Sequence, residues 1–190
     1  MTTSRHAVTS TPLHPLLATR HSTRAFAADA SVTKTQALAL MEAARWAPSC
    51  GNTQPTRFIV GRKESSTFGR ILATLTPGNH GWAQYASMLV VSVATLENKK
   101  GPLPYAEYDA GQAMSHLVVQ AMAEGLTVRQ MAGFDKEMVS KEFDLAATQK
   151  PLSCAAIGVA GDPAALPDDL RGPDDSPRDR LPLDELILAD

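Results

Sequence analysis

The chain has 190 residues, and its 18 basic and 20 acidic side chains give a formal net charge of −2. This near-neutral balance argues against a nucleic-acid partner, because proteins that bind polyanions usually present a basic face. The two cysteines, Cys50 and Cys154, form no C-x-x-C pair and have no histidine at zinc spacing, which argues against a disulfide or a metal site. The longest apolar run, Met88 to Ala94, is too short to span a membrane, and no secretory signal is visible, so we expect a cytoplasmic protein.

The domain organisation follows from the distribution of polar and apolar residues. Residues 1–11 are polar and short of large apolar side chains, which is typical of a flexible segment. The rest of the chain mixes strand-like apolar runs with amphipathic helices, and no repeat or linker divides it. We therefore predict a flexible segment over residues 1–11 and a single α+β domain over residues 12–190.

The first elements of this domain alternate between helix and strand. Helical spacing of apolar residues predicts a helix over Val32 to Trp46, capped by Ser31 or Thr33, and a second helix over Thr67 to Leu75. Between them, Phe58 to Gly61 predicts a short strand.

The middle of the chain begins with turn-forming residues. Pro77-Gly78-Asn79 is expected to end the second helix and to open a loop that holds Asn79 and Trp82. Met88 to Thr95 is continuously apolar, which predicts a central strand buried on both faces. The lysine and proline stretch Glu97 to Pro104 then predicts an exposed loop over the site.

The second half of the chain contains the longest predicted helix. Ala106 to Glu124 has a broad apolar face and is followed by a glycine that can serve as its C-terminal cap, so we expect a buried helix. A strand over Leu126 to Arg129 leads through a turn into a helix over Phe134 to Phe143. Ser153 to Gly161 predicts a further strand, and the Pro-, Asp- and Gly-rich segment Asp162 to Pro177 predicts an extended loop.

Two arginine clusters lie near opposite ends of the chain, Arg20-His21-Ser22-Thr23-Arg24 and Arg178-Asp179-Arg180. A guanidinium group can donate two parallel hydrogen bonds to a phosphate, and a serine hydroxyl adds a further donor. Either cluster alone is more typical of a solvated surface. A third polar segment, Ala47 to Pro55, lies between a predicted helix and strand, where binding residues often occur, and the three segments together favour a bound anion.

With these segments in this order, the chain resembles the FMN-dependent nitroreductase family from about Pro12 to about Ile187. The matching features are the R-x-S-x-R of residues 20–24, the A-P-S-x-x-N-x-Q-P of residues 47–55, the helix Asp109 to Gly125, the turn ending at Gly133, and Arg178 with Arg180. The resemblance implies a central, mainly antiparallel β-sheet flanked by helices. It also implies an intertwined homodimer whose C-terminal extension embraces the partner.

The resemblance further implies which residues hold FMN. Those expected at the phosphate and ribityl chain are Arg20, His21, Ser22, Arg178 and Arg180. Those expected to reach the flavin from the partner chain are Pro48, Ser49 and Asn52. Those whose backbone amides would face the flavin N5 are Met131, Ala132 and Gly133. Arg24 would face the N1 and O2 edge and Asn79 would contact the flavin, whereas Gln54 fits either the cofactor site or a brace within its loop.

The implied activity is that of an NAD(P)H-dependent oxidoreductase. Hydride from NADH or NADPH would pass through the flavin N5 to an electron-poor acceptor, such as a nitroaromatic or a quinone, with ping-pong kinetics. No side chain is expected to be catalytic, because the flavin carries the redox chemistry. Two alternatives stay open: a flavin-dependent dehydrogenase or dehalogenase on the same scaffold, and a flavin-storage protein without turnover.

Several residues have two interpretations at this stage. Cys50, Trp82, Tyr105, Tyr108 and Phe134 would shape an acceptor pocket, but packing is the commoner role of aromatic and free cysteine side chains. The sequence also does not distinguish NADH from NADPH as the electron donor.

Overall fold

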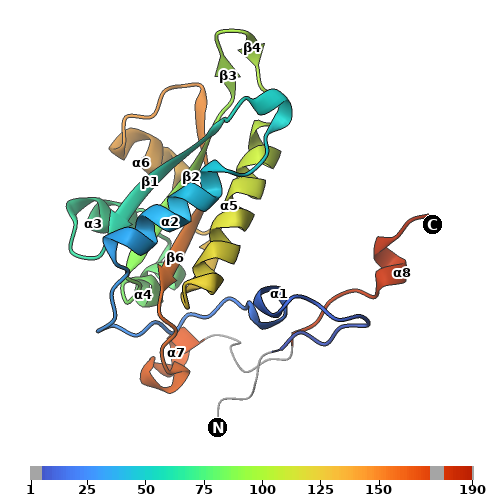
Figure 1. Cartoon of the computed structure of the whole chain (residues 1–190). Coiled ribbons are helices and arrows are strands. Elements are labelled where there is room, and N and C mark those ends of the chain that lie inside the picture. Colours follow the sequence, from blue (N-terminus) through green and yellow to red (C-terminus); the bar gives the residue numbers. More distant parts are fainter. Residues whose placement is uncertain (1–5, 172–177, 190) are drawn as a thin grey trace.

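The computed structural model describes residues 6–171 and 178–189 (Figure 1). Its main sheet has four antiparallel strands in the order β1-β2-β6-β5. These strands are β1 (Thr56–Arg62), β2 (Met88–Thr95), β5 (Thr127–Met131) and β6 (Gln149–Gly158). The predicted central strand over residues 88–95 is confirmed, and all but its last residue are buried because the sheet is covered on both faces.

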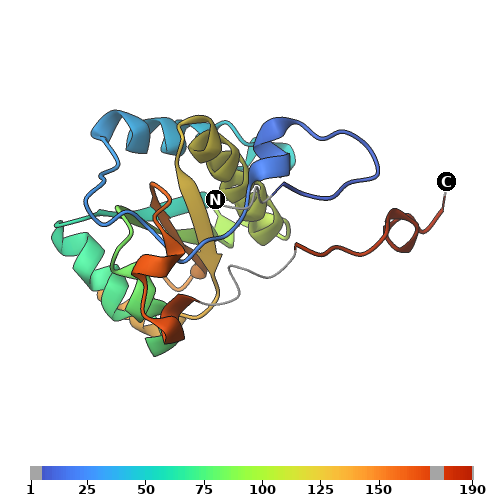
Figure 2. The ribbon, with the colours of Figure 1, turned by 90° about the horizontal axis from the view of Figure 1, so that it is seen from below.

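Helices cover the two faces of the sheet, as Figure 2 shows. One face carries α2 (Lys34–Arg45) and α5 (Ala106–Ala123), and the other carries α3 (Ser66–Ala73) and α4 (Pro77–Ala83). Neighbouring residues of β2 point to opposite faces, so Val90 packs into the α2/α5 core and Val91 into the α3/α4 core. The predicted α+β class, with an antiparallel sheet flanked by helices, is confirmed.

Local sequence signals explain the ends of the two main helices. The Thr33 hydroxyl accepts a hydrogen bond from the Gln36 amide at 3.1 Å, and the Gln36 side chain accepts one from the Thr33 amide at 3.1 Å. This reciprocal capping box makes Thr33, rather than Ser31, the cap of α2. Gly125 follows α5 with a φ of 73°, a left-handed conformation that glycine adopts without steric cost.

The predicted loop around Asn79 and Trp82 is wrong, because these residues belong to α4. Pro77 occupies the first turn of this helix, where its missing N–H has no intrahelical partner to lose. Trp82 is fully buried and stacks near Phe26, with ring centroids 6.2 Å apart, so its apolar surface anchors the helix against the sheet. Tertiary burial therefore outweighs the turn-forming tendency of Pro77-Gly78-Asn79.

Several predicted boundaries also change. The last strand begins at Gln149 and ends at Gly158, instead of spanning residues 153–161, because its first residues pair with the end of β2 across a bulge. The predicted loop over residues 97–104 contains a small hairpin of β3 (Glu97–Asn98) and β4 (Gly101–Pro102). The predicted helix over residues 134–143 is confirmed as the shorter α6 (Lys136–Glu142).

The segment after β6 is more structured than predicted. It contains the 3-10 turn Pro163–Ala165 and α7 (Asp168–Arg171), so the expectation of an extended loop is wrong for this part. Residues 172–177, the remainder of that prediction, lie outside the described residues. The Gly81 backbone lies against Leu170, since a Cβ on Gly81 would come 2.8 Å from its Cδ2.

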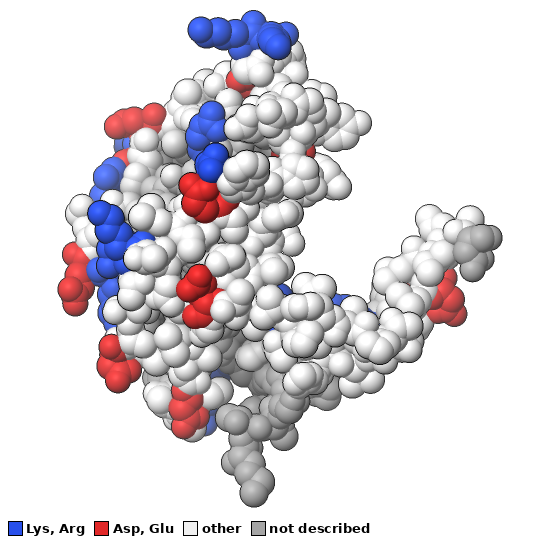
Figure 3. Space-filling model, viewed as in Figure 1, with Lys and Arg blue, Asp and Glu red and all other residues white. Residues whose placement is uncertain are grey.

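Below the sheet, the segment around α1 (Pro15–Thr19) lies beside the start of the C-terminal arm, residues 178–189, where the Arg178 Nη1 donates a hydrogen bond to the Ala18 carbonyl (Figure 1). This arm carries α8 (Leu183–Leu186). The arm points away from the body across an open hollow in Figure 3, and its large apolar side chains are exposed: Leu181, Leu183, Leu186, Ile187 and Leu188. The described residues of one chain therefore do not bury these apolar side chains. No helix in the described ranges is both long and apolar enough to cross a membrane.

Gly61 lies where β1 packs closely against α3. A Cβ at this position would lie 2.6 Å from the backbone N and Cα of Phe68, and backbone atoms cannot move aside as a flexible side chain can. We expect Gly61→Ala to lower the free energy of unfolding by about 1–3 kcal/mol, measured by urea denaturation. Gly69→Ala is the matched control, because Gly69 lies in α3 with no atom within 4 Å of the added Cβ and should gain about 0.5–1 kcal/mol. Equal stability of the two variants would contradict this description of the β1–α3 contact.

Candidate functional site

Arginines from the two ends of the chain come together near α1. The Arg178 Nη1 donates a hydrogen bond to the Ala18 carbonyl at 2.7 Å, which holds the C-terminal arm against the N-terminal segment. Burial lowers the pKa of Arg20 from its ordinary value, and the positive charges of Arg178 and Arg180 lower it further. The guanidinium group still remains charged at neutral pH. The three side chains therefore form a concentrated positive patch, which we call the arginine cluster.

A cavity of about 210 Å³ lies beside the arginine cluster. Its walls come from the N-terminal segment, α5 and β5, and its lining residues are Arg20, Ser22, Gly111, Ser115, Val118, Val128 and Gln130. The Arg20 Nη1 donates to the Ser22 hydroxyl at 3.3 Å, so both groups face a common region. Small residues on α5, Gly111 and Ser115, leave room between the helix and Arg20.

Arg129 holds the segment that carries Ser22. Its Nη1 donates to the Ser22 carbonyl at 2.8 Å, and its guanidinium group lies 5.4 Å from the centre of the Trp82 ring. A cation above an aromatic face is stabilised by the ring quadrupole. Arg129 thus connects β5, α4 and the wall of the cavity.

The turn after β5 is fixed by three hydrogen bonds to one carbonyl. The Gly133 carbonyl accepts from the Thr76 amide at 3.1 Å, from the Thr76 hydroxyl at 3.1 Å and from the Asn79 Nδ2 at 2.9 Å. A Cβ on Gly133 would lie 2.6 Å from that Asn79 nitrogen, so glycine permits this close approach. The backbone of Met131, Ala132 and Gly133 is therefore rigidly placed next to Gln130, at the end of the cavity.

The polar loop over residues 47–55 is also held by hydrogen bonds, but it lines another cavity. Gly51, Asn52 and Gln54 all have positive φ, and the Gln54 amide donates to the Ser49 hydroxyl at 3.0 Å. The Cys50 amide donates to the Oδ2 of Asp109 at 3.1 Å, and Asp109 is buried in the first turn of α5. This carboxylate anchors the loop to the helix.

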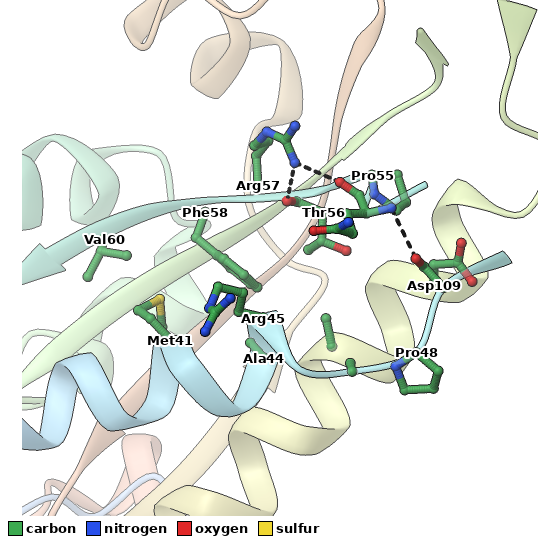
Figure 4. A pocket seen from close by; sticks show the side chains of 14 residues that line it. Met41, Ala44, Arg45, Pro48, Pro55, Thr56, Arg57, Phe58, Val60 and Asp109 are labelled. Carbon is green, nitrogen blue, oxygen red and sulfur yellow. Dashed lines mark hydrogen bonds between the residues drawn. The ribbon is translucent and has the colours of Figure 1, made fainter. Parts of the chain in front are cut away.

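The cavity beside this loop has a volume of about 420 Å³ and lies between α2, β1 and α5 (Figure 4). It includes Pro48, Ser49 and Gln54 in its lining, together with Asp109 and Ala113 of α5. The described residues give it no lining residue in common with the cavity at the arginine cluster. The two halves of the predicted cofactor site therefore line two different cavities in the described part of one chain.

Comparison with known proteins decides the family. A model described as the nitroreductase family matches residues 17–75. A solved structure described as an oxidoreductase containing FMN is 33% identical, covers 96% of this chain and 94% of its own, and superposes with a TM-score of 0.88. The chain belongs to the nitroreductase family.

Other known proteins are also similar to this chain. A nitroreductase family protein from Clostridium difficile shares the fold, with 20% identity over 90% of this chain and 94% of its own and a TM-score of 0.70. A Stenotrophomonas maltophilia protein provisionally named NADH dehydrogenase/NAD(P)H nitroreductase is 28% identical over 183 residues, 85% of this chain and 91% of its own. An uncharacterised 15.4 kDa protein of Mycolicibacterium smegmatis is 33% identical over 141 residues, 70% of this chain and 95% of its own.

Three further predicted site residues of this nitroreductase-family chain make contacts within the protein. The Arg24 Nη1 donates to the Leu170 carbonyl of α7 at 3.4 Å, and the Asn79 Nδ2 is occupied by Gly133. His21 is half-buried, with its Nδ1 3.2 Å from the Thr19 carbonyl. These geometries are compatible with a positioning role, and the cofactor contacts of the three residues stay predictions.

The residues with two interpretations now divide into buried and exposed groups. Trp82 and Phe134 are buried in the core, whereas Tyr105, Tyr108 and Cys50 are exposed. Cys154 is fully buried on β6, and burial raises the pKa of its thiol to about 12. That thiol stays protonated and packs as a small apolar group.

Sequence reasoning missed two positioning residues, Arg129 and Asp109. Arg129 follows an ordinary strand pattern, and only the tertiary structure shows that its side chain reaches the Ser22 carbonyl. Asp109 carried one usable signal, because an acid on the apolar stripe of a helix must have a hydrogen-bond donor when it is buried. This pattern predicts that Asp109 accepts a hydrogen bond, but it does not identify the Cys50 amide as the donor.

Proposed function

We propose that the chain is an FMN-dependent oxidoreductase that uses NADH or NADPH to reduce an electron-poor acceptor such as a nitroaromatic or a quinone. The observation that carries this proposal is the arginine cluster beside a cavity that also contains the Ser22 hydroxyl. Three neighbouring guanidinium groups repel one another, and a phosphate monoester relieves that repulsion while accepting several hydrogen bonds. The donor set therefore fits the phosphate end of FMN.

Each group of residues would contribute a different part of the site. Arg20, Ser22, Arg178 and Arg180 would bind the phosphate, and His21 would lie against the ribityl chain. The rigid turn at Gly133 would present backbone N–H groups to the flavin ring, and Arg24 would stabilise negative charge on the ring. Bound FMN would supply the redox chemistry by exchanging hydride at N5, so no side chain is required as a catalytic acid or base.

We further propose that the active unit is a homodimer with one FMN site at each end of the interface. Two observations support it. Pro48, Ser49 and Gln54 line a different cavity from the one beside the arginine cluster of their own chain, and Asn52 belongs to the same loop as these three residues. The C-terminal arm also exposes a row of large apolar side chains that a second copy would cover. Dependence on NAD(P)H is compatible with the expected cytoplasmic location.

The absorption spectrum of the purified protein tests the proposed function. We expect a yellow protein whose FMN absorbance is bleached by NADH or NADPH without oxygen and restored by a nitroaromatic or quinone, with parallel lines in a two-substrate kinetic analysis. A spectrum that stays unchanged on addition of either nicotinamide would favour flavin storage. Bleaching followed by reoxidation with a halogenated aromatic alone would favour a dehalogenase, and a protein that binds no flavin would overturn the proposal.

A further inference from the structure

A further cavity, which we call the second cavity, adjoins the one at the arginine cluster and is separate from the cavity beside the loop over residues 47–55. It lies under the N-terminal half of α5, has a volume of about 350 Å³, and shares Gly111 and Gln130 with its neighbour. Small-molecule pockets have volumes of about 300–1,000 Å³, so this one suits a single-ring compound and is too small for a whole nicotinamide dinucleotide.

The floor of this cavity is polar, although it is part of the central sheet. Ser92 on β2 is 1% exposed, and its Oγ lies 2.9 Å from the Oγ of Ser153 on β6. The Ser92 Oγ also accepts a hydrogen bond from the Ser153 amide at 3.3 Å. A buried hydroxyl is costly unless it is paired, and this pairing lets two serines replace apolar residues in the sheet. The Ser153 hydroxyl is half-buried and lines the cavity, so it can also bond to a ligand.

The rim of the cavity carries an excess of positive charge. Lys150 forms an ion pair with Glu107 at 2.8 Å, which neutralises both groups. Lys136, at the start of α6, also lines the cavity and is half-buried, and the described part of the chain gives it no ion pair. One lysine charge is thus available to a ligand.

The position of Lys136 relates this charge to the predicted flavin. Gln130 and Lys136 are both in the lining, and they flank the rigid turn of residues 131–133, whose amides would face the flavin N5. A molecule in the second cavity would therefore lie beside the reactive part of the cofactor. This step rests on the proposed function.

We propose that the second cavity is the acceptor site and that it takes a single-ring aromatic acceptor bearing a carboxylate. Lys136 binds the carboxylate, and the Ser153 hydroxyl bonds to a polar atom deeper in the cavity. Lys136 is then a specificity-determining residue, since it distinguishes anionic from neutral acceptors of the same shape.

A pair of isosteric acceptors, 4-nitrobenzoate and 4-nitrobenzamide, tests the proposal by steady-state kinetics with NADH. Each turnover converts the nitro compound, NADH and one proton into the nitroso compound, NAD⁺ and water. We expect Lys136→Gln to lower kcat/KM for 4-nitrobenzoate about tenfold, because one charge-assisted hydrogen bond is lost, and to leave 4-nitrobenzamide unchanged. Lys141→Gln is the control, because Lys141 is an exposed lysine at the other end of the same helix.

A binding measurement separates this proposal from the proposed function. Calorimetric titration of the FMN-loaded protein with benzoate and benzamide needs no turnover, and Lys136→Gln should weaken only benzoate, about tenfold. An equal loss of affinity for both ligands would overturn the proposal. A changed KM for NADH as the main effect of Lys136→Gln would also overturn it, because that result would indicate that Lys136 binds the dinucleotide phosphates. If the wild-type protein reduces neither acceptor but binds benzoate through Lys136, the anion site stands and the proposed activity fails.

Discussion

Arg20→Ala and Arg178→Ala should each bind FMN about 10- to 150-fold more weakly than the wild type, because a hydrogen bond to a charged group contributes about 1.5–3 kcal/mol. Both guanidinium groups belong to the arginine cluster, and the pKa of Arg20 already responds to the charge of Arg178. Fluorescence titration of the apoprotein with FMN gives the dissociation constants. The same titration with riboflavin, which lacks the phosphate, should change little in either variant.

Matched controls separate a phosphate role from a loss of fold. Arg62→Ala removes an exposed arginine at the end of β1 and should keep wild-type FMN affinity. Raising the salt concentration should weaken FMN binding to the wild type more than to Arg20→Ala, because a charge contact is screened by ions. If both cluster variants retain wild-type affinity for FMN, the arginine cluster is not its phosphate site.

The arginine cluster shows what the sequence could predict. Its residue types at the two ends of the chain, taken together with the polar segment over residues 47–55, predicted a bound anion, although either group of arginines alone is more typical of a solvated surface. The long helix and the central strand were also predictable, because the helix has apolar residues at helical spacing and the strand is continuously apolar. The helix and the strand depend mainly on residues close together in the chain.

Features that depend on distant contacts were not predictable in the same way. The α4 helix contains turn-forming residues, and burial of Trp82 against the sheet decides its conformation. The first residues of β6 include Lys150 and Pro151, which are not typical of a strand. They are part of β6 because they pair with the end of β2. Likewise, Ser92 and Lys136 are distant in the sequence, and only the tertiary structure places both of them in the lining of the second cavity.

Two inactive variants of this chain should restore activity to each other when mixed, if the cofactor site is shared between protomers. Arg20→Ala damages the phosphate half of the site, and Asn52→Gly removes the amide expected to reach the flavin of the partner. Glycine is the suitable replacement, because Asn52 has a φ of 54° and glycine keeps that conformation without strain. Each variant alone should lose most of its NADH-dependent nitroaromatic reduction at limiting FMN.

Random exchange of chains between these two variants should produce heterodimers as about half of the population. Each heterodimer would have one intact site and one site with both defects, because a two-fold interface pairs each half-site with its counterpart on the other chain. Activity should therefore rise to about a quarter of the wild-type value after refolding the variants together. A mixture of Arg20→Ala with Ser22→Ala is the decisive control, since both defects affect the same half-site and no rescue is possible. Equal activity in the two mixtures would mean that the loop over residues 47–55 serves its own chain, and that the proposed shared site is wrong.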